Sequence, residues 1–159
     1  MILEITPTKK IEGAITVWNQ PNPDVDVLMD LKKLTYREGS IDEIYAFHVL
    51  DHFFEDEGRE AIKNWTKLLK VNGRLVVVVN DFEYLTRAFI GGDISIEEWN
   101  DNFSNPTNFT KDNLFTFFKE VGFQDGDILT WAKDIIDKGK VLFTKQDFEL
   151  VFSSIKKND

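Results

Sequence analysis

The sequence predicts an α/β fold, in which helices cover a mainly parallel sheet. Short apolar segments that suit strands alternate with segments whose apolar residues recur every three or four positions, as they do on one face of a helix. Residues 74–79 end in four consecutive valines, which leave no polar face, and this is typical of a central strand buried on both sides. Together, these two observations predict a layered α/β sandwich.

Four strands are predicted in the first third of the chain. They cover residues 2–5, 14–18, 25–29 and 41–47, and each is rich in residues that suit a buried pleat. Only about eight residues separate the first two strands, whereas a crossover with a helix needs a dozen or more. Either this connection is a bare loop, or the two strands are not simple parallel neighbours.

Two helices are predicted around the valine strand. The first spans about residues 56–70, and Asn72-Gly73 is expected to end it and turn the chain into the strand. The second begins after Thr110, which suits an N-cap, and ends before Gly122. Each has one apolar face, formed by Ala61, Ile62, Trp65, Leu68 and Leu69 in the first and by Leu114, Phe117, Phe118 and Val121 in the second. Residues 127–131 and 148–155 are predicted to be strands.

The composition indicates a globular protein and excludes some partners. Its 159 residues suit a single domain, 1–159, with one core. The formal net charge of −9 disfavours nucleic acid and anionic membranes, because phosphate contacts need a basic face. No segment approaches the length of a membrane span, and no signal-peptide pattern is seen. There are no cysteines, so a cytoplasmic protein without disulfides is expected.

Both histidines lie in one five-residue stretch, His48-Val49-Leu50-Asp51-His52. Two imidazoles four positions apart could face one side of a helical turn and bind zinc, as in H-x-x-E-H metalloproteases. However, the stretch follows a strand, Asp51 replaces the glutamate base, and no third ligand is evident. The simpler interpretation is a turn after a strand, with one polar and one packing histidine, and no metal site is expected.

Polar residues also follow two other predicted strands. Asp30 comes after the third strand, and Asn80-Asp81 follow the valines. Open α/β sheets bind their ligands beyond the carboxyl ends of the strands, so these positions are candidates for a site. Polar residues also reappear at strand ends for structural reasons alone, and position does not separate the two interpretations.

From residue 25 onward, the order of residues resembles the compact class I S-adenosylmethionine-dependent methyltransferases of the methyltransferase type 11 kind. The resemblance rests on residues 26–34, 39–45, 48–52, 68–75 and 81–85, together with the late helix leading to Val121-Gly122-Phe123. It covers nearly the whole chain. It implies a three-layer sandwich with a Rossmann-like sheet of seven strands, one of them antiparallel near the C-terminus. In the most similar subgroup, a short loop replaces the first crossover helix.

The resemblance also implies where the cofactor S-adenosylmethionine would bind. The family has a G-x-G turn after the first strand, whereas this chain has Thr6, Pro7 and Thr8 there. A β-carbon narrows the approach to the cofactor, and proline removes a donor. The family also has an acidic residue at the end of the second strand, which accepts hydrogen bonds from the ribose. Trp18 stands at that position and cannot accept them.

The adenine side of the implied cofactor site is retained. Asp30 and Leu31 match the family positions at the adenine edge, and Ala46, Phe47 and Val49 match the stretch that lines the cofactor after the fourth strand. The threonine hydroxyls could contact the charged end of the cofactor, and Trp18 could stack on its ribose or adenine.

Two functions are therefore expected. The first is methyl transfer to an oxygen or nitrogen of a small molecule or sugar, with His48, His52 and Asp81 as candidate proton acceptors. Histidine is favoured, because imidazole ordinarily changes protonation state near neutral pH. The alternative is a methyltransferase-like module that no longer catalyses and instead binds a ligand or a partner. Residues 90–108 would lie over the substrate side or form the contact of a homodimer.

Overall fold

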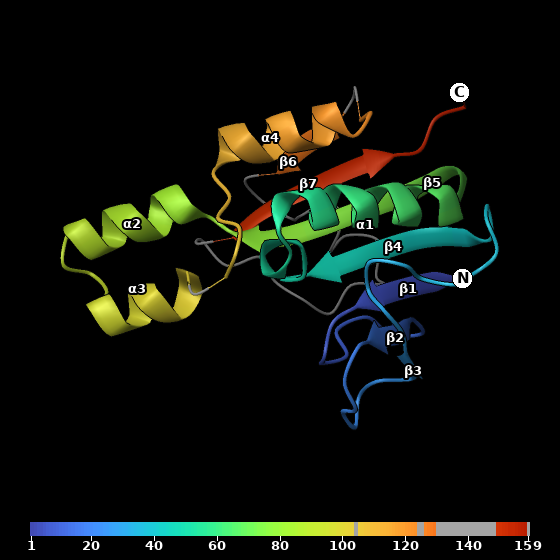
Figure 1. Cartoon of the computed structure of the whole chain (residues 1–159), viewed down its shortest axis with the longest axis horizontal. Coiled ribbons are helices and arrows are strands. Elements are labelled where there is room, and N and C mark those ends of the chain that lie inside the picture. The colour runs from blue at the N-terminus through green and yellow to red at the C-terminus, as the bar shows by residue number, and fades with distance from the viewer. Residues whose placement is uncertain (104, 124–125, 130–148, 159) are drawn as a thin grey trace.

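The computed structural model contains a seven-stranded sheet in the order β3-β2-β1-β4-β5-β7-β6 (Figure 1). It describes residues 1–103, 105–123, 126–129 and 149–158. The first five strands are parallel, and β7 pairs antiparallel with β5 and β6. The predicted α/β fold, with a mainly parallel sheet and an antiparallel strand near the C-terminus, is therefore confirmed. The strands are β1 (Ile2–Ile5), β2 (Ile15–Trp18), β3 (Val27–Leu28), β4 (Ile41–Phe47), β5 (Leu69–Asn80), β6 (Gly126–Leu129) and β7 (Glu149–Ile155).

The connection between β1 and β2 is a bare loop, as the short spacing suggested. The two strands are parallel neighbours, with Leu3 opposite Ile15. Glu4 of β1 is completely buried, and its Oε2 accepts hydrogen bonds from the backbone amides of Lys10 and Ile11, at 3.0 Å each. Its Oε1 accepts one from the Thr16 hydroxyl at 2.7 Å. A buried carboxylate thus fixes the loop that stands in place of a crossover helix.

The sheet separates two hydrophobic cores. The alternation of side chains along a strand puts Val77 and Val79 in the larger core, and Val76 and Val78 in the smaller one. Helices α1 (Glu55–Leu68) and α4 (Lys111–Glu120) cover the larger core, where Trp65 and Phe118 are completely or almost completely buried (Figure 1). The valine strand is therefore buried on both sides, as predicted. Ile11 and Ala14 of the β1–β2 loop contribute to the smaller core.

Helix α1 ends earlier than the sequence suggested. It ends at Leu68, and Leu69 already has extended backbone and belongs to β5. Asn72-Gly73 therefore does not end the helix but lies within β5, where the pairing with β4 changes register between Ile41 and Glu43. Asn72 has a φ of 65°, so these residues form an irregularity in the strand rather than a helix stop. Thr110 caps α4 as predicted, because its hydroxyl accepts a hydrogen bond from the amide of Asn113 at 3.3 Å.

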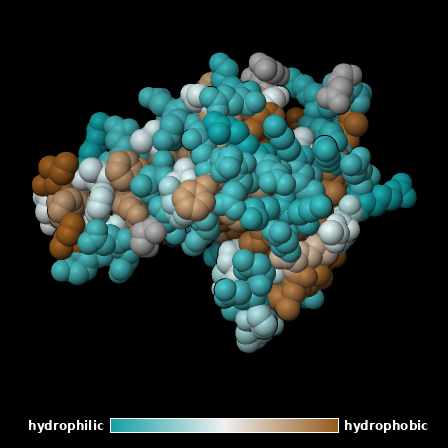
Figure 2. Space-filling view, viewed as in Figure 1, coloured by the Kyte–Doolittle hydropathy of each residue, from teal (hydrophilic) through white to brown (hydrophobic). Residues whose placement is uncertain are grey.

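Two helices follow β5 that the sequence did not reveal. Helices α2 (Phe82–Ile90) and α3 (Ile96–Phe103) form a hairpin that projects from the sheet (Figure 1). Phe82, Phe89, Trp99 and Phe103 hold it together through ring contacts with centroids 4.8 to 6.1 Å apart. Hydrophobic surface gathers at its tip (Figure 2), where Ile90 and Ile96 are exposed.

Candidate functional site

The carboxyl ends of the parallel strands bring most of the predicted site residues to one edge of the sheet. The register places Ile5 beside Val17 and Ala46, and Ala46 beside Val77. The residues at the ends of these strands and directly after them must therefore share that edge, where open α/β sheets bind ligands. They are Thr6, Pro7, Thr8, Trp18, Asp30, Leu31, His48, Val49 and Asp81.

The Thr6–Thr8 turn uses its own polar groups internally. The Thr6 side chain is buried, and its Oγ1 donates to the carbonyl of Thr8 at 3.1 Å and accepts from the amide of Thr8 at 3.3 Å. The Thr6 amide donates to the Val17 carbonyl at 3.2 Å. Pro7 is half-buried and Thr8 is exposed. Of the two threonines, only Thr8 therefore presents an exposed side chain to a ligand.

The ends of β2 and β3 carry one aromatic and one acidic candidate. Trp18 is half-buried and packs against the larger core. Asp30 is exposed, and its Oδ1 accepts a hydrogen bond from the Lys32 amide at 2.9 Å. Leu31 is buried, and its carbonyl accepts the indole N–H of Trp65 at 2.8 Å. One hydrogen bond within the turn and one from α1 thus fix the positions of Asp30 and Leu31.

The candidates at and just after the end of β4 contribute buried side chains. Ala46 and Val49 lie in the larger core, and Phe47 lies in the smaller one. Their backbone passes along the carboxyl edge between β1 and β5. Any contact of this stretch with a ligand would therefore rely mainly on backbone groups and on the residue that follows it, His48.

His48 is the first residue after the end of β4. Its φ of 52° is unusual for a side chain other than glycine, and such a conformation often marks functional positions. Its Nε2 lies 2.5 Å from Oε2 of Glu149, the first residue of β7. About a third of the His48 side chain is exposed, whereas that of Glu149 is 9% exposed. A largely buried carboxylate thus orients an accessible imidazole.

Asp51 is the most unusual carboxylate of this region. It is only 5% exposed and lies in the short 3-10 helix η1 (Leu50–His52). Its Oδ2 accepts a hydrogen bond from the Asn105 side chain at 3.3 Å, but its Oδ1 has no hydrogen-bond partner among the described residues. Burial raises the pKa of Asp51, and the imidazoles of His48 and His52 act in the opposite direction.

A cavity of about 440 Å³ opens beside these residues. It brings together β4, η1, the end of β5, α3 and the segment after α3. His52 is exposed on its rim, and Asn80 of β5 donates to the side-chain oxygen of Asn102 at 3.1 Å. The residues that line it are His48, Asp51, His52, Asn80, Asp101, Asn102 and Asn105. Two of the three predicted proton acceptors, His48 and His52, therefore face one cavity.

The third predicted proton acceptor, Asp81, has a structural task. It is the N-cap of α2, and its Oδ1 accepts hydrogen bonds from the amides of Glu83 and Tyr84 at 3.1 and 3.2 Å. Such a carboxylate stabilises the first turn of a helix. Asp81 is not among the residues that line the cavity with His48.

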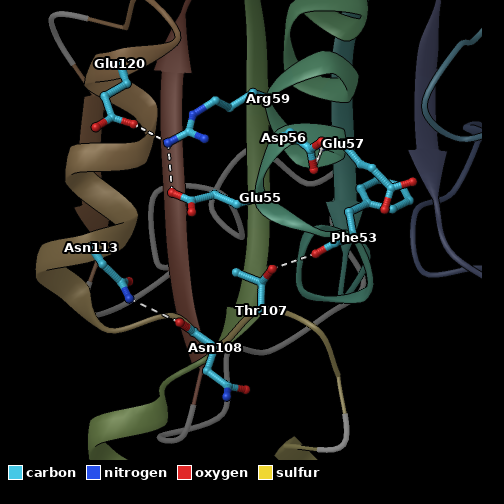
Figure 3. Close-up of polar contacts among 9 residues, drawn as sticks. All are labelled: Phe53, Glu55, Asp56, Glu57, Arg59, Thr107, Asn108, Asn113 and Glu120. Atoms are coloured by element: carbon cyan, nitrogen blue, oxygen red, sulfur yellow. Dashed lines mark hydrogen bonds and ion pairs between the residues drawn. The ribbon is translucent and has the colours of Figure 1, made fainter.

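The segment after α3 crosses the strand ends and is tied to the start of α1. The Thr107 hydroxyl donates to the Phe53 carbonyl at 2.6 Å (Figure 3). The Thr107 amide donates to the Asp51 carbonyl at 3.3 Å. The side chain of Asn113 holds Asn108 by a hydrogen bond of 3.1 Å from α4 (Figure 3). These contacts hold the chain next to Asn105, and thus one wall of the cavity, against η1.

The paired histidines do not form the geometry of a zinc motif. His48 precedes η1 and has a left-handed backbone, so it does not share a helical turn with His52. Its Nε2 is also engaged with Glu149. Among the described residues, no group of three or more histidine, cysteine, aspartate or glutamate side chains could hold a metal ion.

Sequence reasoning missed Glu149, Asp101 and Asn105, and it mentioned Asp51 only as part of the zinc pattern. Glu149 begins an antiparallel strand that was predicted to start one residue earlier, at a position outside the described residues. Its pairing with Asn80 is what brings it to the carboxyl edge. A polar residue at the start of an antiparallel strand is the only signal in the sequence that could have identified it.

Residues 4–77 match the family described as "Methyltransferase domain". No curated protein matches the sequence significantly. Among the helices that the structure describes, none has the length and apolarity to cross a bilayer.

Several solved structures share the fold at low sequence identity. An S-adenosylmethionine-dependent methyltransferase from Thermotoga maritima is 19% identical, with a TM-score of 0.60 over 90% of this chain and 72% of its own. A methyltransferase complexed with the Haloferax volcanii Trm112 methyltransferase activator is 13% identical, with a TM-score of 0.61 over 99% and 82%. The 1,6-didemethyltoxoflavin-N1-methyltransferase of Burkholderia thailandensis, which binds S-adenosylhomocysteine, is 13% identical, with a TM-score of 0.59 over 99% and 71%.

Proposed function

We propose, on the premise that this chain belongs to the class I S-adenosylmethionine-dependent methyltransferases, that it transfers a methyl group to a small molecule. The premise rests on the match of residues 4–77 and on the shared fold. The acceptor would be an oxygen or nitrogen nucleophile of a small molecule or sugar. The observation that carries the proposal is the His48–Glu149 pair. This pair lies at the carboxyl edge of the sheet, beside the residues that we propose to bind the cofactor.

The residues at this edge divide into a cofactor half and an acceptor half. Thr8, Trp18, Asp30 and the backbone of residues 46–49 would hold S-adenosylmethionine, with Asp30 at the adenine. When bound, the cofactor would supply an electrophilic sulfonium methyl group. The exposed carboxylate of Asp30 and the buried Leu31 fit an adenine edge, which needs one hydrogen-bond acceptor beside an apolar surface.

His48 would accept the proton that the nucleophile loses. An ionised Glu149 can only accept hydrogen bonds, so it would keep the proton of the imidazole on Nε2. Nδ1 is then the basic nitrogen of the ring. His52 is exposed on the rim of the same cavity and would act as a second, more weakly positioned acceptor. Asp81 would contribute through the position of α2 rather than through proton transfer.

The test is a calorimetric titration of the whole chain with S-adenosylmethionine and S-adenosylhomocysteine. We expect micromolar binding that is lost in Asp30→Ala and retained in Asp112→Ala, which removes an exposed carboxylate from α4. Binding that Asp30→Ala leaves unchanged would contradict the assignment of the adenine position.

An inactive binding or partner module is the second candidate. It is favoured by the internal hydrogen bonds of Thr6 and by Trp18, which offers no carboxylate to a ribose. Loss of two charge-assisted hydrogen bonds would weaken cofactor binding by roughly 3 to 6 kcal/mol. Absence of binding at millimolar ligand would establish this candidate. The exposed Ile90 and Ile96 at the α2–α3 tip would then be a homodimer contact to test by sedimentation. For both candidate functions, we propose a cytoplasmic location.

A further inference from the structure

The cavity beside His48 has a consistent chemical character. All seven described residues that line it are polar, and none of them is lysine or arginine. Two are aspartates, Asp51 and Asp101, and three are asparagines. Such a lining favours a ligand that is positively charged and rich in hydrogen-bonding groups, and it disfavours phosphates, carboxylates and apolar rings.

One oxygen of the Asp51 carboxylate has no hydrogen-bond partner among the described residues. Oδ1 of Asp51 is buried and has no partner among the described residues, although the other oxygen of the same carboxylate is held by Asn105. A buried polar atom without a partner costs free energy, so its presence needs an explanation. Asp51 also lines the cavity, so a donor group on a ligand that reaches this oxygen would supply the missing hydrogen bond.

We propose that the methyl acceptor is a hydroxylated amine of the amino-sugar or amino-alcohol class, whose ammonium group binds to Asp51. The inference rests on the proposed function and names its substrate class. Asp101 lies on the exposed part of α3 and adds a second negative charge at the cavity. An ammonium group has three donors and no acceptor, so it satisfies an unpaired carboxylate oxygen better than a hydroxyl does.

The three asparagines would bind the hydroxyl groups of the methyl acceptor. Asn80 and Asn102 are joined by one hydrogen bond, and Asn105 donates one to Asp51. A primary amide has two donors and one oxygen that can accept twice, so these contacts leave capacity at each side chain. Hydroxyl groups both donate and accept, and they can use that remaining capacity.

The reaction balances with groups that the proposal already contains. The bound ammonium gives one proton to Nδ1 of His48 and becomes a neutral amine with a free electron pair. That pair forms a bond to the methyl carbon while the carbon–sulfur bond breaks, and the sulfur keeps the bonding electrons. The products are S-adenosylhomocysteine and a methylated ammonium, and the proton leaves His48 to the solvent across its exposed face.

The experiment compares glucosamine with glucose by calorimetry near neutral pH, using the whole chain with and without S-adenosylhomocysteine. The two sugars differ only at C2, where glucosamine has an ammonium group in place of the hydroxyl of glucose. The ratio of their dissociation constants therefore compares an ammonium with a hydroxyl at one position. We expect glucosamine to bind at least tenfold more tightly than glucose, and Asp51→Asn to bring this ratio close to one. Asp101→Asn should reduce the ratio by a smaller factor, and Asp112→Asn, outside the cavity, should leave it unchanged.

The outcomes separate the two proposals. Equal binding of glucosamine and glucose by the unaltered chain would overturn the amine inference, even if S-adenosylhomocysteine binds and the proposed function stands. Preference for glucosamine that depends on Asp51, without any binding of S-adenosylhomocysteine, would support the amine site and contradict the methyltransferase activity. Preference that survives both Asp51→Asn and Asp101→Asn would place the amine elsewhere and overturn the inference.

Discussion

Nε2 of His48 lies 2.5 Å from Oε2 of Glu149, although 101 positions separate the two residues in the chain. The antiparallel pairing of β7 with β5 creates this contact, because it puts Glu149 beside Asn80 at the carboxyl edge of the parallel strands. The end of one strand thus supplies the imidazole, and the beginning of another supplies the carboxylate that orients it.

Replacing Glu149 with glutamine should slow methyl transfer by about a hundredfold, because an amide can donate to Nε2 and shift the imidazole proton to Nδ1. The turnover number should fall, whereas the affinity for S-adenosylhomocysteine should not change. Methyl transfer to glucosamine and calorimetry measure the two quantities. Glu120→Gln, which alters an exposed partner of Arg59 on α4, is the control. Unchanged turnover in Glu149→Gln would show that the pair has no role in the reaction.

Replacing Trp18 with aspartate should strengthen the binding of S-adenosylhomocysteine by about tenfold or more. The carboxylate would accept hydrogen bonds from the ribose at the position where the resembling family has an acidic residue. The free energy of unfolding should fall by about 1–2 kcal/mol, because Trp18 packs against the larger core. Calorimetry and urea denaturation test this prediction. Trp18→Ala removes the same packing without adding a carboxylate, and an equal gain of affinity in that variant would refute the explanation.

Replacing Asp51 with asparagine should raise the free energy of unfolding by about 1 kcal/mol at neutral pH. The substitution removes a buried charge, one oxygen of which has no partner in the part of the chain that the structure describes. Burial raises the pKa of Asp51 above its ordinary value of 3.8, so the native protein holds this proton more tightly than the unfolded chain does. The charged form therefore destabilises the native state as the pH rises through the native pKa.

The gain from Asp51→Asn should consequently be largest at neutral pH and should shrink as the pH falls below the native pKa of Asp51. Urea denaturation at several pH values measures it. Asp112→Asn, an exposed position, should change stability by less than about 0.5 kcal/mol at every pH. If the gain in the free energy of unfolding increased toward acidic pH, the result would contradict this prediction.

Replacing Gly73 with alanine should lower the free energy of unfolding by about 1–3 kcal/mol. A β-carbon there would lie 2.8 Å from the Lys70 carbonyl oxygen and 3.0 Å from that of Asp42, and both are backbone atoms. Asn72→Gly serves as the comparison, because it relieves the positive φ of the preceding residue and should not destabilise. If Gly73→Ala and the unaltered chain had the same thermal unfolding temperature, the result would contradict the predicted clash of the β-carbon with these carbonyl oxygens.

The sequence alone was sufficient for the elements whose patterns are local. The valine strand, the apolar face of α1 and the Thr110 cap follow from periodicity and side-chain chemistry, and the structure contains them. The α2–α3 hairpin was missed because its aromatic residues pack on each other rather than on the sheet, so no single apolar face points toward the core. The end of α1 was misjudged because strand pairing of Leu69 outweighed its place in the helical pattern.

The sequence by itself determined the class of fold, the strand ends that carry Asp30 and His48, and the Thr-Pro-Thr turn of residues 6–8. Only the tertiary structure decided that Asp81 caps a helix and that Glu149 meets His48. It also decided that Asp51 lines a polar cavity and has one oxygen without a partner among the described residues. The physical reason is the distance along the chain over which each interaction acts. Periodicity and capping act over a few residues, whereas strand register and burial are set by segments far apart in the chain.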